Sequence, residues 1–129
     1  MVFTCRMSLD NLIDREPIFP STFTIVKEGL ILMSEFAENS GKPLTRDTTK
    51  WKPSIAYPIL IKEGTAIATF TSEGKFGNSL GGRTFAAFYQ GYDVRGILVV
   101  WTNPNTGRVE SRAFNLSTPE AKSFRIINV

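Results

Sequence analysis

The stretch that decides the fold runs from Arg83 to Thr102 and reads Arg-Thr-Phe-Ala-Ala-Phe-Tyr-Gln-Gly-Tyr-Asp-Val-Arg-Gly-Ile-Leu-Val-Val-Trp-Thr. Its two halves, 83–90 and 95–102, are apolar runs of strand length. Runs that are apolar on both faces are typical of strands covered on both sides. The residues between them, Gln90 to Asp93, are types that favour a tight turn. The stretch therefore predicts two paired central strands joined by a turn at 90–93.

Outside this hairpin the apolar residues recur mostly with the period of two that is typical of strands, and turn-forming residues separate the runs. The further candidate strands are 22–27, 30–36, 55–62, 65–72, 108–116 and 122–128, with 108–116 expected at an edge. Helical spacing is confined to 8–15, with Ser8 as a candidate N-cap, and to one turn that begins near Ser117. The sequence predicts one domain, 1–129: an all-β antiparallel sandwich of seven or eight strands. A short helical or extended arm, 1–20, precedes the strands.

The composition is globular but lacks several catalytic residue types. Of 129 residues, 42% are hydrophobic and 21% charged, histidine is absent, and Cys5 is the single cysteine. These counts exclude Ser-His-Asp and Cys-His catalysis within the chain, histidine-ligated metals, zinc fingers and an intramolecular disulfide. Cys5 has only Arg6 beside it to lower its pKa, so we interpret it as a small buried or incidental residue.

The net charge of +3 is unevenly distributed along the chain. Residues 1–41 carry three basic and six acidic side chains, whereas 42–82 and 83–129 each carry six basic and three acidic ones. This surplus is too dispersed for specific nucleic-acid binding. No apolar run is long enough to span a membrane, and Arg6 and Asp10 interrupt any signal-peptide pattern. We therefore expect a cytoplasmic protein, or one released without a classical leader.

The sequence predicts no catalytic site, cofactor or metal. The glycine-rich segment 73–82 lacks both the P-loop and the dinucleotide-binding pattern, so we interpret it as a hairpin loop. Without histidine, an enzyme would need a carboxylate pair, a tuned lysine, or a hydroxyl nucleophile with a lysine base. Nothing in the sequence shows such groups converging, so an enzyme is the last of the functions considered.

Aromatic and basic residues occur together outside the predicted strands. Lys50-Trp51-Lys52 places an indole between two lysines, Tyr57 follows soon after, and Tyr92 stands in the predicted turn. Amphipathic rings beside cations suit a membrane interface, and such rings also stack on sugars. The structural alternative is that Trp51 closes the end of the sandwich while its lysines face solvent.

The segment from about Glu38 to Leu116 resembles the actinoporin-like family of membrane-binding β-sandwich cytolysins. The resemblance lies in Asn39-Ser-Gly-Lys42, Gly64-Thr-Ala-Ile67, Gly81, Phe85-Ala-Ala-Phe-Tyr89 and Ile97-Leu-Val-Val-Trp-Thr-Asn-Pro104. It implies a phosphocholine pocket that carries over at Ser54, Thr102 and Pro104 only. Glu110 stands where the family has a pocket tyrosine, and Phe114 is the only trace of a tryptophan pair. The family's long pore-forming helix is not matched by 8–15.

The leading hypothesis is a non-enzymatic protein that binds lipid head groups at a membrane surface and is related to pore-forming toxins. Its candidate ligand-binding residues are Trp51, Ser54, Tyr57, Tyr92, Thr102, Pro104, Phe114, Lys50, Lys52 and Arg108. One alternative is a lectin in which Trp51 or Tyr92 stacks on a sugar ring. Another is a structural module that self-assembles through an uncovered strand such as 108–116, giving a homo-oligomer.

Overall fold

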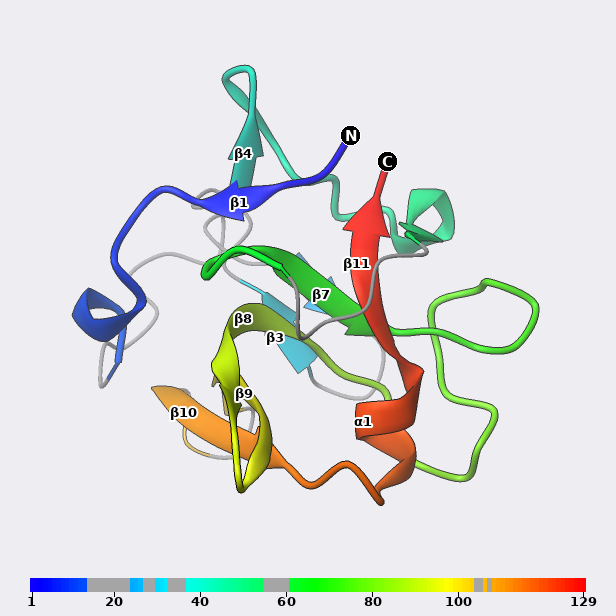
Figure 1. The fold of residues 1–129 in the computed structure, drawn as a ribbon. Helices are drawn as coiled ribbons and strands as arrows, with labels where there is room; N and C mark the ends of the chain where they lie inside the picture. Colours follow the sequence, from blue (N-terminus) through cyan, green and yellow to red (C-terminus); the bar gives the residue numbers. More distant parts are fainter. Residues whose placement is uncertain (14–23, 27–29, 33–36, 55–60, 104–105, 107) are drawn as a thin grey trace.

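The computed structural model describes residues 1–13, 24–26, 30–32, 37–54, 61–103, 106 and 108–129. Within them the chain forms two antiparallel sheets with very little helix, which confirms the predicted all-β, sandwich-like fold (Figure 1). The larger sheet has the order β2-β3-β9-β8-β7-β11-β6, and β10 pairs with β9. Its strands are β2 (Thr24–Val26), β3 (Leu30–Leu32), β6 (Lys52–Pro53), β7 (Ala66–Thr69), β8 (Ala86–Asp93), β9 (Gly96–Thr102), β10 (Val109–Phe114) and β11 (Phe124–Asn128).

A three-stranded sheet lies beside this larger one. It consists of β1 (Thr4–Cys5), β4 (Ala37–Asn39) and β5 (Lys42–Pro43), in the order β1-β4-β5. The turn between β4 and β5 has Ser40 at φ 54° and Gly41 at φ 79°, which confirms the tight turn expected there. Short 3-10 helices occur at Leu9–Asn11 and Thr48–Lys50, and α1 (Pro119–Ser123) leads directly into β11.

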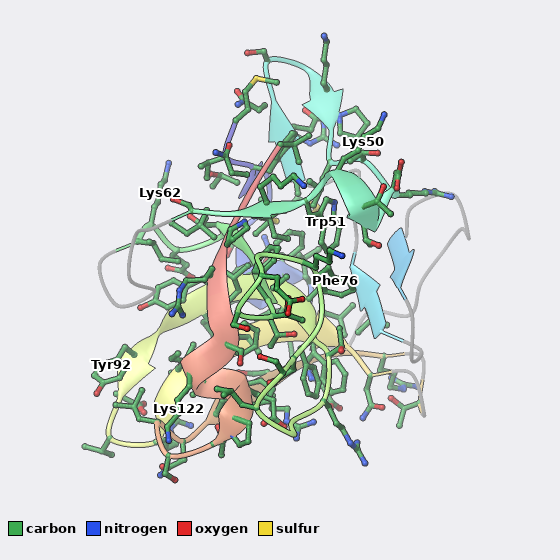
Figure 2. All side chains as sticks on the ribbon, turned by 90° about the vertical axis from the view of Figure 1, so that its right-hand side faces the viewer. Lys50, Trp51, Lys62, Phe76, Tyr92 and Lys122 are labelled. Carbon is green, nitrogen blue, oxygen red and sulfur yellow. The ribbon has the colours of Figure 1, made fainter. Side chains whose placement is uncertain are left out.

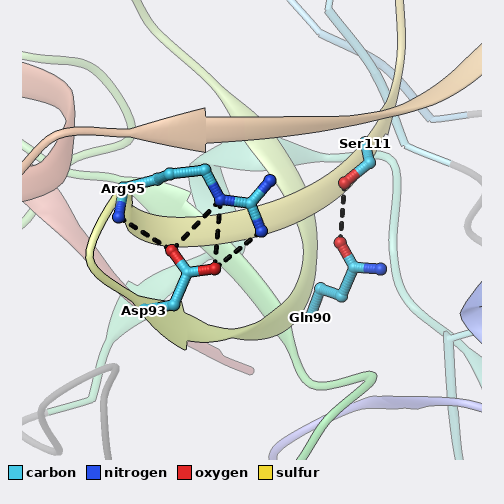
Figure 3. Close-up of polar contacts among 4 residues, drawn as sticks. All are labelled: Gln90, Asp93, Arg95 and Ser111. Atoms are coloured by element: carbon cyan, nitrogen blue, oxygen red, sulfur yellow. Dashed lines mark hydrogen bonds and ion pairs between the residues drawn. The ribbon is translucent and has the colours of Figure 1, made fainter.

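The central hairpin forms the core of the large sheet, as its sequence predicts. Residues 86–89 of β8 and all of β9 except Leu98 are buried. The turn, however, lies at Val94–Arg95 and not at 90–93, because β8 continues to Asp93 across an irregularity in register between Tyr89 and Gly91. A β-bulge of this kind lets a strand pass through residues that would otherwise favour a turn. Asp93 then holds the true turn through hydrogen bonds to Arg95 (Figure 3).

Several other expected elements are shorter than predicted. In the described part of the predicted helix, residues 8–13, the structure has the 3-10 turn Leu9–Asn11, and the apolar side chains of Leu9 and Leu12 are buried. Most of the candidate strand 55–62 lies outside the described residues, and 61–62 are not in a strand. The predicted helical turn after Ser117 is confirmed as α1, with the Thr118 side chain accepting the Ala121 N–H at 3.3 Å.

A line of aromatic rings fills the space beside β8, β9 and β10. Phe85 packs edge-to-face on both Trp101 and Phe114, and Phe114 packs on Phe124, with centroid distances of 4.9–5.2 Å. The Arg112 guanidinium lies over the rings of Phe85, Trp101 and Phe114 at 4.8–5.4 Å. Edge-to-face pairs and a cation over ring faces both add to the energy of apolar burial.

Candidate functional site

The structure does not gather the ten predicted ligand-binding residues into one site. Trp51, Thr102 and Phe114 are buried, with 1%, 1% and 3% of their surfaces exposed. The Trp51 indole N–H donates to the Thr45 carbonyl at 3.0 Å, so the ring is anchored inside and the expectation of an exposed indole is wrong. Tyr57 and Pro104 lie outside the described residues.

The remaining five predicted residues are spread over the molecule. Tyr92 is 47% exposed on β8, and Figure 2 shows it at the opposite end from Lys50 and Trp51. Lys50, Lys52 and Arg108 are exposed, and Ser54 is half-buried. Trp51, Lys52 and Ser54 line the two hollows described next, and whether any of the ten binds a ligand stays a prediction.

Two neighbouring hollows mark this part of the surface. The first, which we call the hydroxyl hollow, has a volume of about 450 Å³. Its lining is rich in side-chain hydroxyls and includes two cations: Pro53, Ser54, Phe70, Thr71, Ser72, Gly74, Ser79, Leu80, Lys122, Ser123 and Arg125. The second, the aromatic hollow, has about 420 Å³ and is lined by Thr48, Thr49, Trp51, Lys52, Gly74, Lys75 and Phe76. Gly74 lines both hollows.

The wall between the hollows is a tight hairpin built around Thr71. The Thr71 N–H donates to the Lys75 carbonyl at 2.7 Å, the Gly74 N–H donates to the Thr71 carbonyl at 2.9 Å, and the Thr71 hydroxyl oxygen accepts the Lys75 N–H at 3.2 Å. Gly74 has φ 80°, a conformation that glycine adopts without steric cost. The hairpin loop predicted at 73–82 therefore exists, and its residues also line the two hollows.

Asn78 fixes the far wall of the hydroxyl hollow. Its side-chain oxygen accepts the Leu80 N–H at 3.0 Å and the hydroxyl of buried Ser123 at 3.1 Å. Its amide nitrogen donates to the Arg83 carbonyl at 3.3 Å. One amide thus ties the loop 78–83 to α1 and places Ser79 and Ser123 around the same space.

The charges that line the hollows are all positive among the residues that the structure describes. Lys52 and Lys75 contribute to the aromatic hollow and Lys122 and Arg125 to the hydroxyl hollow, whereas neither lining contains an aspartate or glutamate. Nearby Asp47 caps the helix Thr48–Lys50, and the hydrogen bond from the Thr49 hydroxyl, followed by that from its backbone N–H, lowers the Asp47 pKa. A concave surface lined by one sign of charge attracts ligands of the opposite sign.

Cys5 is remote from this chemistry. It lies in β1, where its N–H donates to the Gly64 carbonyl at 2.7 Å and its register partner is Ala37. Burial raises the pKa of its thiol, which favours the unreactive protonated form. The interpretation of Cys5 as a partly buried residue agrees with its placement. Within the described ranges, no group of three histidine, cysteine, aspartate or glutamate residues could hold a metal ion.

Sequence reasoning missed both hollows. Their hydroxyls come from the 3-10 helix Thr48–Lys50, from Ser54 directly after β6, from the hairpin 71–76, from the loop 77–83 and from α1, which are widely separated along the chain. The only local signal is the density of serine, threonine and glycine in 69–84. That signal equally fits an ordinary solvated loop.

Comparisons with known proteins give one informative likeness. No family model matches the chain, and no curated protein matches it. A solved structure of type 6 secretion amidase effector 2 (Tae2) is similar, with a TM-score of 0.54 and 24% identity over 64% of this chain and 71% of that chain. At this identity the likeness shows a shared fold.

This likeness contradicts the prediction of a non-enzymatic protein that binds lipid head groups or glycans, because the neighbour in fold is named as an amidase. The resemblance to the actinoporin-like family is not tested by the comparisons and stays a prediction. In the described part of the chain, no helix has the length and apolar character needed to cross a bilayer.

Proposed function

We propose that this protein is an amide-bond hydrolase whose substrate binds in the hydroxyl hollow. The observation that carries the proposal is a hollow lined by hydroxyls, a lysine and an arginine within a fold similar to that of an amidase effector. The described lining of this hollow holds no carboxylate pair, whereas it contains both residue types that a hydroxyl nucleophile with a lysine base requires.

Ser79 is the proposed nucleophile. Its hydroxyl oxygen accepts the Ser72 N–H at 3.3 Å, an arrangement that leaves the hydroxyl proton available for transfer. The hydroxyl of Ser123, by contrast, already donates to Asn78 and is buried. An exposed hydroxyl at the rim is also the easier one for a substrate carbonyl to reach, and Ser79 is exposed.

In the proposed reaction the Ser79 oxygen bonds to the amide carbonyl carbon while its proton passes to the Lys122 amine, which acts as the base. The carbon–nitrogen bond then breaks as the proton moves to the leaving amine, and water hydrolyses the remaining ester. Arg125 supplies positive charge near the developing oxyanion. Its guanidinium is held by the carbonyls of Lys122 and Phe124 at 3.0 and 2.7 Å.

The test is cleavage of a mixture of defined peptides, followed by mass spectrometry of the products. We expect Ser79→Ala and Lys122→Met each to lower the rate at least about a hundredfold, because each removes a group that takes part in the chemistry. Ser111→Ala is the matched control, since Ser111 is an exposed serine that lines neither hollow and whose hydroxyl donates to Gln90 (Figure 3). Failure of the unaltered protein to cleave any amide bond would refute the proposal, as would full activity of Ser79→Ala.

A further inference from the structure

The two hollows adjoin at Gly74, which carries no side chain and which we call the ridge. Among the described residues, Gly74 is the one that lines both. A methyl group added to it would touch only the ring of Pro53, at 3.6 Å, so the other side of Gly74 is open space. An extended ligand can therefore lie across Gly74 and occupy both hollows, whereas a side chain at this position would stand in its path.

The floor of each hollow offers apolar contact. Phe76 is half-buried and packs edge-to-face on Trp51 at a centroid distance of 5.0 Å, with the indole fixed by its bond to Thr45 (Figure 2). In the hydroxyl hollow the apolar lining includes buried Phe70 and exposed Leu80. Because Trp51 is fully packed, the aromatic hollow keeps its shape without a ligand.

The rims of both hollows carry cations that point to an acidic ligand. Lys52 and Lys75 are exposed at the aromatic hollow, Arg125 lines the hydroxyl hollow, and none of the three forms a salt bridge to another described residue. Asp47 and Glu73 are neighbours of lining residues along the chain, but neither lines a hollow. Hydrophobic and cationic contacts in the same hollows suit a ligand that carries both apolar and carboxylate side chains.

We infer that the aromatic and hydroxyl hollows form one groove, continuous over Gly74, that binds acidic peptides with apolar side chains. This inference rests on the proposed function for its choice of a peptide, and it goes further by naming the substrate class and a second subsite. The hydroxyl hollow holds the amide to be cleaved, and the aromatic hollow holds an apolar and carboxylate-bearing portion some residues away.

The continuity of the groove is tested by filling its ridge. Gly74→Asn keeps a residue that tolerates positive φ but adds a side chain at the junction. Gly41→Asn is the matched control, since Gly41 has φ 79° against 80° for Gly74 and lies in the remote β4–β5 turn with open space around it. With the probe hexapeptide (Leu-Glu)3 and isothermal titration calorimetry, we expect Gly74→Asn to raise Kd at least about fivefold and Gly41→Asn to leave it unchanged.

The charge preference is tested with the same probe and its opposite, (Leu-Lys)3. The acidic peptide should bind more tightly, and the preference should fall at high salt because exposed charges are screened. Lys52→Met and Lys75→Met should each raise Kd about two- to fivefold, the range expected for exposed ion pairs. Lys62→Met is the control, because Lys62 is equally exposed but lies apart from both hollows (Figure 2).

The outcomes separate this inference from the proposed function. Binding of (Leu-Glu)3 that depends on Gly74, Lys52 and Lys75 supports the groove even if no amide bond is cleaved. Equal binding of both peptides, no binding of either, or identical effects of Gly74→Asn and Gly41→Asn overturns it. If the protein instead cleaved only peptides that are not acidic, at a rate that Gly74→Asn leaves unchanged, the result would support the proposed amide hydrolysis and contradict the proposed groove. Circular dichroism of each variant confirms that it is folded.

Discussion

The hairpin region of β8, β9 and β10 and the hollowed region around 71–83 are held together in different ways. In the hairpin region, six register pairs join β9 to β10, and the exposed charges Asp93 and Arg95 pair with each other. In the hollowed region, single side chains such as Thr71 and Asn78 hold the loops, and the exposed lysines have no salt bridge among the described residues. In the hairpin region the charges of Asp93 and Arg95 neutralise each other, so this pair offers a ligand little net charge. In the hollowed region the lysines remain available to bind an acidic ligand.

The largest expected effect comes from a methyl group in the hairpin region. A Cβ added to Gly96 would lie 2.0 Å from the Phe114 carbonyl oxygen, and Gly96 has φ 112°. Gly96→Ala should therefore lower the free energy of unfolding by about 3 kcal/mol or more, through overpacking and backbone strain together. Urea denaturation followed by circular dichroism measures the loss. Gly91→Ala is the control, because no atom lies within 4 Å of its added Cβ; equal stability of the two variants would contradict this account.

In the hollowed region, removing one amide should matter nearly as much. Asn78→Ala leaves the buried Ser123 hydroxyl and the Leu80 N–H without their protein acceptor. We expect a loss of about 1–3 kcal/mol in urea denaturation, the cost of an unsatisfied buried group. Hydrogen exchange should also quicken at the amides of 78–83. Asn115→Ala provides the comparison, because Asn115 makes similar hydrogen bonds in an exposed turn. A cost no greater than that of Asn115→Ala would show that Asn78 does not organise the hollow.

A third change should stabilise the hairpin region. Thr102 is 1% exposed, and its hydroxyl has no hydrogen-bond partner in the described structure. Thr102→Val removes that cost while keeping the shape, so the free energy of unfolding should rise by about 1 kcal/mol. Thr69→Val should have the opposite sign, since the Thr69 hydroxyl oxygen accepts the Phe85 N–H at 3.0 Å. Thermal denaturation of both variants checks the pair, and destabilisation by Thr102→Val would mean that its hydroxyl is satisfied.

The smallest effect concerns the internal ion pair of the hairpin turn. The hydrogen bonds from Arg95, the side chain first, hold the Asp93 pKa below its ordinary value. A lowered folded-state pKa means that the pair contributes stability above the pKa of an unfolded aspartate, about 3.9, and that this contribution is lost as the pH falls through the folded-state pKa. NMR titration of the Asp93 carboxyl carbon should give a midpoint below 3.9 that moves upward in Arg95→Met. If the midpoint were unchanged in Arg95→Met, the Arg95 side chain would not be the cause of the lowered Asp93 pKa.

Sequence patterns predicted the hairpin region far better than the hollowed one. The apolar runs 83–90 and 95–102 carry their own strand signal, because burial on both faces requires continuous apolar residues. The bulge at Gln90 escaped notice because a bulge leaves residue types unchanged and alters only register. Trp51 was misplaced because its lysine neighbours suggested exposure, whereas a backbone carbonyl six residues away, that of Thr45, secures the ring inside.

The hollowed region could not be predicted, because its geometry depends on hydrogen bonds between distant residues. Asn78 and Ser123 are 45 residues apart, and neither has a pattern that marks the other as a partner. The helical turn after Ser117 was predictable from a local capping pattern, although the residue that caps it is Thr118 and not Ser117. Local sequence signals therefore predicted individual strands and turns. They did not predict the hollows, which form where segments distant in sequence come together.

The two tryptophans of the chain divide between the two regions, which gives each region its own optical reporter. Trp51 forms part of the aromatic hollow, and Trp101 lies in β9 beneath the Arg112 guanidinium. Indole emission shifts to longer wavelength when the ring meets water, so a variant that keeps only one tryptophan reports the opening of one region alone. Trp51→Phe would follow the hairpin and Trp101→Phe the groove. Comparing their emission during denaturation would reveal whether the groove loosens before the sheet unfolds.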